Sequence, residues 1–471
     1  MPAIITNDTK KLLIEKIIAD TADSDTRYFI GIGRSDTWQD STDVAPIASQ
    51  IINSPREETN FRTNLQSAAL TATVSFVSPR YNWSSGTIYR AYEGDVSAAG
   101  NGSSNDTGNS RYYVITENNR VYICLQQGRT ATGQINPSLN NPGDEILPSE
   151  GTKLLGDGYV WRFLTLLDPA KLNNFATANF LPVEKILDSG QSAAEQLQKA
   201  AQDAAVAGEI TGYKIVAGGA GYATTSTATI EGNGTGATIK LTASPTTGAI
   251  VKAEVDSNGS GGFGFGSGYD YANVKITSSS TPTSAAVIRP TISTNGVGAD
   301  PRDDLRSTAI MFNSRLVGAA GSGDFLVDQE FRQVGLMRNL LKINDSDFTA
   351  VTGNALRKLT VSGNDLTKNM TIQGGSTGAK AYVDEAVVDG GNTILYYHQN
   401  EKTGFTQFTS ADVGANAIFD VLNPTTKTGE FVSDSDGEFN PFSGELLYLD
   451  NRAAIERDSA STEDVKIIIQ F

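Results

Sequence analysis

Gly156–Pro169 reads GDGYVWRFLTLLDP and is the stretch that best predicts the fold class. It opens with Asp-Gly turn chemistry and continues as a run of aromatic and aliphatic residues, which favour the pleated surface of a strand. Pro169 can neither donate to a strand ladder nor continue a helix, so we expect the run to stop there. The stretch therefore predicts a buried core strand. It contains no nucleophile, base or metal-ligand pair at a spacing that serves chemistry.

Short β runs, separated by Gly, Asn, Asp, Ser and Pro, continue this pattern from Arg27 onward. Leu70–Val77 alternates between polar and apolar residues with the period of a strand. Arg111–Thr116 and Arg120–Leu125 alternate in part, and the three residues between them predict a hairpin turn. Such runs are typical of an all-β sandwich or barrel. We predict an all-β, multi-domain body with two inserted β modules and a few short helices.

Two helices are expected. Near the start, Asp8 or Thr9 can cap a short helix whose apolar stripe contains Leu12, Leu13, Ile17 and Ile18. Residues Ser192 to Ala207 are rich in Ala, Gln and Glu and predict a helix that links the first two hundred residues to the glycine-rich region after them.

An internal repeat marks the first inserted module. Gly218–Tyr222 (GGAGY) returns as Gly266–Tyr269 (GSGY), an offset of 268 − 221 = 47 residues, and alternating β residues come after each copy. The glycines supply turn positions with positive φ, and each tyrosine can pack across its turn. A second interpretation is sugar stacking by exposed aromatic residues, namely Tyr222, Tyr269, Phe263 and Phe265.

The second inserted module centres on Ile372–Val383, IQGGSTGAKAYV, which predicts two strands around a tight Gly-Ser-Thr-Gly turn. A phosphate-binding loop would need the order Gly-x-x-x-x-Gly-Lys-Ser/Thr and then a helix. Neither is present, so we expect no nucleotide site there.

Three stretches carry a family resemblance. Tyr28–Trp38 reads YFIGIGRSDTW, Gly156–Trp161 reads GDGYVW, and Ser443–Arg452 reads SGELLYLDNR before the terminal apolar run Val465–Phe471. In this order they resemble the baseplate wedge protein of T-even-type contractile-tailed bacteriophages. Phe331-Arg332-Gln333 is also similar to a strand of that family. The resemblance covers roughly the first two hundred residues, a stretch near Asp303 to Leu341 and the tail, but neither inserted module.

The resemblance and the repeats together predict four domains. These are a baseplate-wedge body (1–90, 300–348 and 430–471), a second β domain ending in a helical linker (91–205), a Gly-Tyr repeat β insertion (206–296) and a second β insertion (350–428).

A structural role in a virion is implied by the resemblance. It implies a homodimeric late protein that links neighbouring wedge proteins and peripheral, fibre-side proteins of the tail baseplate during assembly and host attachment. Candidate interface residues, by type and motif position, are Arg34, Trp38, Arg80, Trp83 and Arg452. The tryptophans can instead be core residues, and Arg34 and Arg452 can instead tie turns to carbonyls.

Composition narrows the classes of partner. The formal charge is 37 − 53 = −16 without a basic patch, which disfavours nucleic acid. No apolar run approaches the roughly 20 residues of a membrane helix, and the first residues lack a signal-peptide pattern. We expect a protein assembled in the host cytoplasm and carried in the virion. The single cysteine, Cys124, lies in an apolar run and predicts a buried side chain rather than a reactive thiol.

Catalytic and cofactor signals are sparse. The one histidine, His398, is expected at the surface at a strand end, although a Ser-His-Asp triad would have to use it. Histidine and cysteine counts exclude the usual zinc sites, and no acidic cluster has EF-hand spacing, although calcium at one such loop stays open. We predict no enzyme, cofactor or metal. The alternatives are a host-surface glycan-binding module and, less favoured, a polysaccharide-cleaving tail enzyme with two carboxylates.

Overall fold

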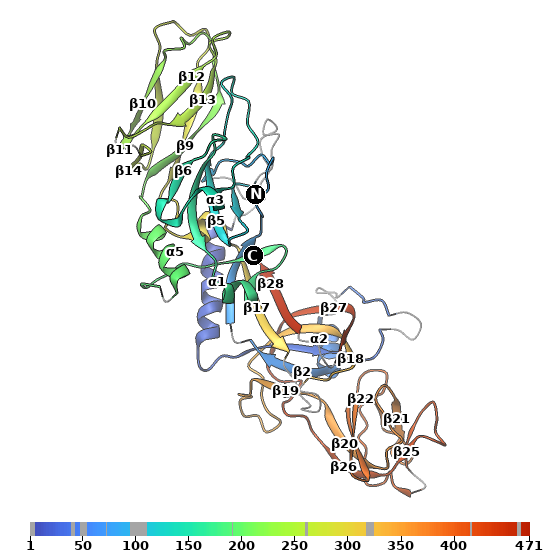
Figure 1. The fold of residues 1–471 in the computed structure, drawn as a ribbon. Coiled ribbons are helices and arrows are strands. Elements are labelled where there is room, and N and C mark those ends of the chain that lie inside the picture. Colours follow the sequence, from blue (N-terminus) through green and yellow to red (C-terminus); the bar gives the residue numbers. More distant parts are fainter. Residues whose placement is uncertain are drawn as a thin grey trace. The chain divides into compact units, whose positions relative to one another are not determined.

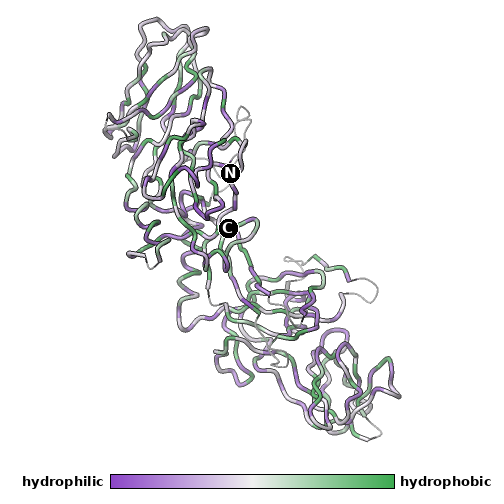
Figure 2. The backbone as a smooth tube through the Cα atoms, viewed as in Figure 1, coloured by the Kyte–Doolittle hydropathy of each residue, from purple (hydrophilic) through white to green (hydrophobic). Residues whose placement is uncertain are grey.

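The computed structural model describes residues 5–38, 43–47, 54–71, 73–94, 111–190, 192–259, 262–316, 325–414, 417–458 and 463–471 (Figure 1). The chain divides into two compact units. Unit 1 consists of Met1–Ile14, Ser75–Ile310 and Gln470–Phe471, and unit 2 of Glu15–Val74 and Met311–Ile469. Antiparallel strands in several sheets build both units, with few short helices, so the predicted all-β class is confirmed. Figure 2 shows short hydrophobic stretches alternating with hydrophilic ones along the chain, as expected for sheets.

Four elements contain a boundary between the units: α1 (Asn7–Ala22), β3 (Thr73–Pro79), β17 (Ala309–Leu316) and β28 (Glu463–Gln470). The alternating run Leu70–Val77 is divided between two strands, because β2 (Leu65–Leu70) ends where that run begins and β3 starts at Thr73. β3 pairs with β8 (Phe180–Val183), and Phe76 lies opposite Val183.

The N-terminal helix differs from its prediction in cap and stripe. Thr6 Oγ1 accepts a hydrogen bond from the Thr9 backbone N (3.3 Å), so the cap lies before the helix rather than inside it. Ile14 is its buried residue, whereas Leu12 and Leu13 are exposed. No helix among the described residues is long and apolar enough to cross a membrane.

A four-stranded sheet in unit 1 has the order β4-β5-β7-β6. Its strands are β4 (Tyr113–Ile115), β5 (Arg120–Gln126), β7 (Val160–Leu166) and β6 (Thr152–Leu154). Tyr113 lies opposite Ile123, which confirms the predicted hairpin, and Asn119 in its turn takes a φ of 59°.

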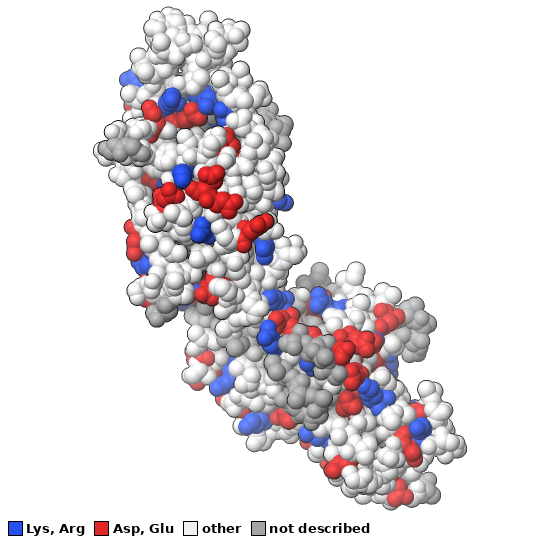
Figure 3. Space-filling view, in the orientation of Figure 1, with Lys and Arg blue, Asp and Glu red and all other residues white. Residues whose placement is uncertain are grey.

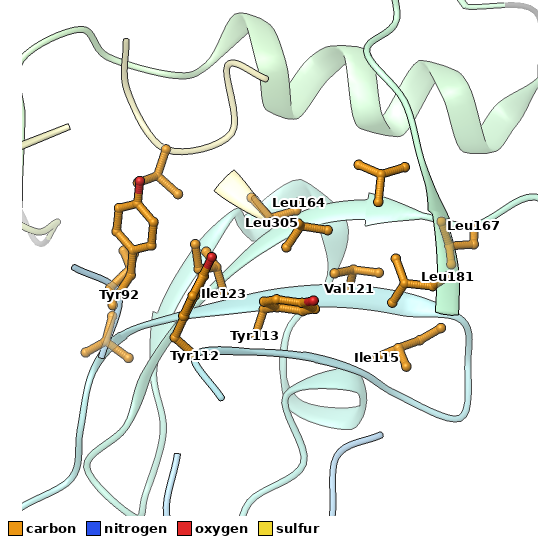
Figure 4. Close-up of a cluster of buried hydrophobic side chains, with 14 residues drawn as sticks. Tyr92, Tyr112, Tyr113, Ile115, Val121, Ile123, Leu164, Leu167, Leu181 and Leu305 are labelled. Carbon is orange, nitrogen blue, oxygen red and sulfur yellow. The ribbon is translucent and has the colours of Figure 1, made fainter. Parts of the chain in front are cut away.

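Strand β7 is buried on both faces, which explains its nearly continuous apolar run. Val160 and Leu164 belong to one core cluster, shown in Figure 4 with Tyr92, Tyr112 and other side chains around it. Trp161 belongs to a second cluster on the opposite face, together with Cys124 and Phe163. The predicted core strand is therefore confirmed.

Pro169, at the end of the Gly156–Pro169 stretch, has a second role that the sequence did not predict. Pro169 stops the strand but also begins a helix, α4 (Pro169–Phe175), because proline suits the first helical position. Asp168 Oδ1 caps it by accepting from the Ala170 backbone N (2.8 Å). The predicted linker helix is confirmed as α5 (Ala193–Asp203), which Ser192 and Glu195 cap reciprocally. The remaining short helices of unit 1 are α3 (Pro142–Glu145), the 3₁₀ turn η1 (Pro148–Glu150) and α6 (Pro301–Asp304).

The Gly-Tyr repeat module consists of four two-stranded pairs, whose strands gather in one body in Figure 1. The pairs are β9 (Glu209–Ala217) with β16 (Val287–Ser293), β10 (Thr227–Gly232) with β15 (Ala272–Thr277), β11 (Thr235–Ala237) with β14 (Phe265–Ser267), and β12 (Ile239–Ala243) with β13 (Ile250–Val255). The strands that come after the two repeat copies, β10 and β15, pair with each other. Gly221 and Gly268 take φ values of 83° and 73°, as a turn role requires.

Unit 2 contains a five-stranded sheet of order β19-β2-β1-β18-β27. The strands not yet bounded are β1 (Tyr28–Gly33), β18 (Gln329–Arg338), β19 (Thr352–Asn354) and β27 (Glu445–Arg457), and α2 (Ser54–Thr63) also lies in this unit. All residues of β1 are buried. Gly31 and Gly335 are cross-strand partners, and a Cβ at either would approach the Phe61 ring to 3.2 Å or less. The glycines thus let Phe61 pack onto the sheet.

A seven-stranded sheet in unit 2 contains the strands of the second inserted module together with β26, whose residues were predicted to belong to the body, in the order β25-β24-β21-β22-β23-β20-β26. Its strands are β20 (Arg357–Ser362), β21 (Thr371–Gly374), β22 (Lys380–Asp389), β23 (Asn392–His398), β24 (Ile418–Asp420), β25 (Thr428–Gly429) and β26 (Phe431–Ser435). β21 and β22 pair across the Gly-Ser-Thr-Gly turn, which confirms the predicted hairpin. Asp412 holds this turn by accepting from the Ser376 and Thr377 backbone N atoms at 3.1 and 3.0 Å.

The two units are coarser than the four predicted domains. Unit 1 contains the predicted second β domain and the Gly-Tyr repeat module, and unit 2 contains most of the predicted body and the second insertion. The four-domain division stays a prediction.

Candidate functional site: a buried polar junction

Some of the stretches that carry the family resemblance meet in the five-stranded sheet of unit 2, whereas GDGYVW runs into β7 in the four-stranded sheet of unit 1 and the terminal run forms β28 of another sheet. Gly33 of β1 lies opposite Gln333 of β18, and Gln333 lies opposite Asn451 of β27. The Gln333 amide also donates to Asn451 Oδ1 (3.0 Å). Segments far apart along the chain thus form adjacent strands, and the turn after β1 packs beside them.

That turn is held by a buried arginine. Arg34 has a φ of 65°, in the left-handed region that non-glycine residues rarely adopt. Its guanidinium lies over the Trp38 ring at 4.3 Å and donates to the Thr37 carbonyl (3.2 Å) and to Asn60 Oδ1 (3.2 Å). Burial lowers the pKa of Arg34, and the nearby Asp36 carboxylate opposes that change. The geometry matches the expectation of an arginine that ties a turn to carbonyls.

A second buried arginine, Arg332 of β18, fastens the same turn to the sheet. Its Nη1 donates to the Ser35 carbonyl (2.5 Å), and its Nε donates to Asp43 Oδ1 (2.7 Å). The hydrogen bonds from Arg332 lower the pKa of Asp43 below its ordinary value. The Arg-Ser-x-x-Trp turn is therefore rigid for reasons visible in its own contacts.

His398 lies at the end of β23 and contacts this turn from the side of the second inserted module. Its Nδ1 is 2.7 Å from Asp384 Oδ2, and the Asp384 side chain is completely buried. The Ser35 hydroxyl donates to the other oxygen of Asp384. The Gln329 amide donates to the Asp384 carbonyl (2.6 Å), so β18 also contacts β22 here. One carboxylate thus joins the histidine to the turn after β1.

The other ring nitrogen of His398 faces a second acid. His398 Nε2 is 3.8 Å from Asp36 Oδ1, an oxygen without a hydrogen-bond partner among the described atoms. Lys402 Nζ bonds the other oxygen of Asp36 (3.0 Å). Asn400 is 3.2 Å from the same ring nitrogen and donates to Asn64 Oδ1 (2.8 Å). We call this set of six residues the polar junction: Ser35, Asp36, Asp384, His398, Asn400 and Lys402.

The polar junction favours a charged histidine. Burial lowers the pKa of His398, but the carboxylates of Asp384 and Asp36 outweigh that effect, and the pKa lies above its ordinary value. The expectation that His398 lies at the surface is therefore wrong, because His398 is only 4% exposed. The geometry is also not that of a nucleophile with its base. Ser35 donates its proton to the carboxylate that His398 binds, so the serine and histidine share an acceptor.

The predicted interface residues fall into two groups. Arg34 and Trp38 are buried, and the Trp38 indole donates to the Arg452 carbonyl (2.9 Å), so these two act inside unit 2. The Arg452 side chain is half exposed and pairs with Asp450 at 3.0 Å. In unit 1, Arg80 and Trp83 are partly exposed; Arg80 donates to Asn82 Oδ1 (2.9 Å) and Trp83 to Ser138 Oγ (3.3 Å). Whether any of them contacts a partner stays a prediction.

The other candidate residues from the sequence, namely the cysteine, the acidic clusters and the aromatic residues of the repeat, are described next by their contacts and burial. Burial raises the pKa of the Cys124 thiol, as expected for an inert core residue. Among the acidic clusters, Asp434 and Asp436 each bond Arg357 at 2.6 Å. In the part of the chain that the structure describes, no three His, Cys, Asp or Glu side chains are grouped to hold a metal ion. Tyr269 is buried and packs against Gly234, so its ring is not open to a sugar.

Comparisons with protein-family models and with curated proteins gave no match to this chain. The family resemblance therefore depends on the motif residues themselves. Sequence reasoning missed Asp384 and Ser35 as members of a site. The available signals were an aspartate in the middle of the β run of 380–389 and a serine inside the Arg-Ser-x-x-Trp motif.

Proposed function

We propose that this chain is a structural subunit of a phage tail baseplate wedge, which links neighbouring wedge and peripheral proteins during assembly and host attachment. One observation carries the proposal. The resembling stretches in β1, β18 and β27 form one sheet, and the motif turn after β1 packs on it through Trp38 and Arg332. These motifs lie far apart in the chain yet share one sheet, as expected if they are the signature of one body, whereas the GDGYVW motif runs into β7 in the four-stranded sheet of unit 1.

A scaffold role suits the chemistry of the polar junction. The chain has one histidine, and it is buried in a pair with Asp384. Such a group holds two sheets together but offers no access to a substrate. In Figure 3 acidic and basic side chains intermingle over the face shown. We therefore propose no enzymatic activity, and partners that are proteins, including a second copy of this chain.

The first test is the oligomeric state, measured by size-exclusion chromatography with light scattering. The full chain is compared with a variant that lacks Tyr213–Pro290. Gly212 and Thr291 are cross-strand partners, so a two-residue Asn-Gly turn can join them. The shortened variant keeps Glu209, whose buried carboxylate binds Arg162. We expect both proteins to be dimers. A monomeric or trimeric full chain contradicts the wedge proposal.

A second test concerns location. Gold-labelled antibodies against the purified chain are applied to contractile-tailed particles from the same source and viewed by electron microscopy. We expect label at the baseplate and none along the fibres. Label confined to fibre tips would favour the alternative, a host-surface binding module.

A further inference from the structure

A groove in unit 1 separates the four-stranded sheet from the β12–β13 hairpin of the Gly-Tyr repeat module. Its cavity has a volume of about 610 Å³. Segments from the end of β5, from β6, and from β12 and β13 form its walls. Its main side chains, which define the basic groove, are Arg129, Lys153, Lys240, Lys252, Glu254 and Phe263.

The charge of this lining is opposite to that of the chain. Four basic residues and two acids, Glu254 and Asp256, line the cavity, so its formal charge is 4 − 2 = +2 in a chain of −16. A cleft with low-dielectric walls concentrates such a field and attracts anions. Lys240 is exposed and lies opposite Glu254 in the β12–β13 register, but the two form no ion pair among the described residues. It is the cation most available to a ligand.

The other bases of the groove are positioned by their own chain. Lys153 Nζ bonds the Glu145 carbonyl (2.8 Å) and pairs with Glu150 at 3.4 Å, and Lys252 pairs with Glu254 at 3.0 Å. Arg129 Nη1 donates to the Gly133 carbonyl (2.9 Å). These contacts hold the charges in place and leave them on the groove wall. The positions of the cations are thus fixed before any ligand arrives, which reduces the entropy cost of binding.

Neutral and aromatic side chains complete the lining of the basic groove. A second cavity of about 450 Å³ also has Gln126, Arg129 and Glu254 in its lining. Phe263 adds an aromatic surface, and its ring stacks on Phe265 at 5.1 Å between centroids. Neutral hydrogen-bonding groups also line the groove, namely Thr152, Ser257 and Gln126. Separated cations, neutral polar groups and one aromatic ring fit a polymer of polar rings that carries occasional negative charges.

We propose that the basic groove binds an acidic oligosaccharide, whose anionic groups meet Lys240 and its neighbours while a sugar face contacts Phe263. This inference goes beyond the structural role, because a wedge subunit needs no ligand of this kind. A nucleic acid is a poorer fit, since its closely spaced phosphates would face Glu254 and Asp256 as well as the overall negative charge.

The test measures binding of fluorescein-labelled hexasaccharides to the full chain by fluorescence anisotropy. The probes are hexagalacturonate, oligosialic acid, a heparin hexasaccharide and neutral maltohexaose, beside a 12-nucleotide single-stranded DNA. We expect at least one acidic sugar to bind at least 10-fold more tightly than maltohexaose, with an affinity that falls as salt is raised. Absence of binding by all three acidic sugars, or tighter binding of the DNA, overturns the proposal.

Variants locate the site. We expect Lys240→Glu to weaken binding of the acidic sugar by at least 10-fold, and Phe263→Ala to weaken it by about 3-fold or more. The matched control is Lys275→Glu, because Lys275 is an exposed lysine on β15 of the same module but outside the groove. Equal losses in Lys240→Glu and Lys275→Glu would show binding by general charge and overturn the assignment.

Lys240 is exposed, so its substitution leaves the fold intact, which a thermal unfolding curve checks. The oligomeric state is measured separately, so failure here leaves the wedge proposal to its own test.

Discussion

The two inserted β modules are attached to their neighbours by different chemistry. The Gly-Tyr repeat module begins at Glu209, whose buried carboxylate accepts from Arg162 Nη1 and Nη2 at 2.5 and 2.9 Å and from the Val297 backbone N at 2.8 Å. The second module is attached through the polar junction, which contains a histidine. An arginine keeps its proton at any ordinary pH, whereas a histidine does not. The cation of the first attachment therefore keeps its charge at any ordinary pH, whereas the charge of the second depends on pH.

The largest effect is expected from removing the arginine of the first attachment. Arg162→Met leaves the Glu209 carboxylate buried without its cation, and we expect unit 1 to lose about 3–5 kcal/mol of unfolding free energy. Urea unfolding at pH 7 measures this loss. The control is Lys275→Met, because Lys275 pairs with Glu231 in solvent, and we expect no measurable change there. A loss in Arg162→Met no greater than in the control would show that the pair does not hold the module.

The second prediction concerns the histidine. At pH 6, His398→Gln removes a buried charge partner of Asp384, and we expect unit 2 to lose about 3 kcal/mol. Fluorescence of Trp38 is a convenient reporter, since Trp83 and Trp161 lie in unit 1. Hydrogen exchange of β22 and β23 should rise in the same variant.

The direction of the pH dependence is set by the raised pKa of His398. The folded state binds the proton more tightly than the unfolded state, so its stabilisation is complete below the unfolded pKa, about 6.5. It is lost as the pH rises through the higher pKa of the folded protein. We expect unit 2 to be less stable at pH 9 than at pH 6, and the difference between wild type and His398→Gln to shrink over that interval. Parallel pH curves for the two proteins would contradict the role of His398.

A third prediction places a different pH window in unit 1. Burial raises the pKa of Asp304 to about 8, although the Gly298 backbone N donates to its carboxylate (2.7 Å). In the folded protein Asp304 keeps its proton up to about pH 8, whereas in the unfolded chain it loses the proton near pH 4. The free energy of unfolding of unit 1 therefore falls as the pH rises from about 4 through 8. We expect Asp304→Asn to stabilise unit 1 by roughly 2 kcal/mol at pH 9 and to change it little at pH 5. Urea unfolding at both pH values measures this, and destabilisation at pH 9 would refute it.

The smallest effect is expected at the hydroxyl of the polar junction. Ser35→Ala removes one hydrogen bond to the Asp384 carboxylate but keeps its histidine partner. We expect a loss of about 1–2 kcal/mol in unit 2, with the pH dependence retained. Thermal unfolding at pH 6 and pH 9 checks both parts. Loss of the pH dependence would mean that Ser35, rather than the ion pair, positions His398.

Local sequence patterns predicted much of this fold. Hairpins such as 111–125 and 372–383 were predictable because alternation and turn residues act over a few positions. Pro169 shows the limit of such patterns, since a proline both ends a strand and suits the start of a helix. The Asp168 cap before it was the signal for α4.

The polar junction was not predictable in the same way. Ser35 and Asp384 are 349 residues apart, and their contact depends on how two sheets pack. His398 lies in an alternating run, where period alone cannot say whether a strand end is covered by another part of the chain. Arg34 was assigned from its motif, and its turn-holding contacts agree with one of the two roles considered for it.

The position of the two ends of the Gly-Tyr repeat module has a consequence for the evolution of the protein. Glu209 and Ser293 are cross-strand partners, so the chain leaves and returns at neighbouring positions. A segment with adjacent ends can be lost, lengthened or exchanged between genomes as a cassette, while the host sheet keeps its register. The same property makes this position a natural graft point for a fluorescent or affinity domain.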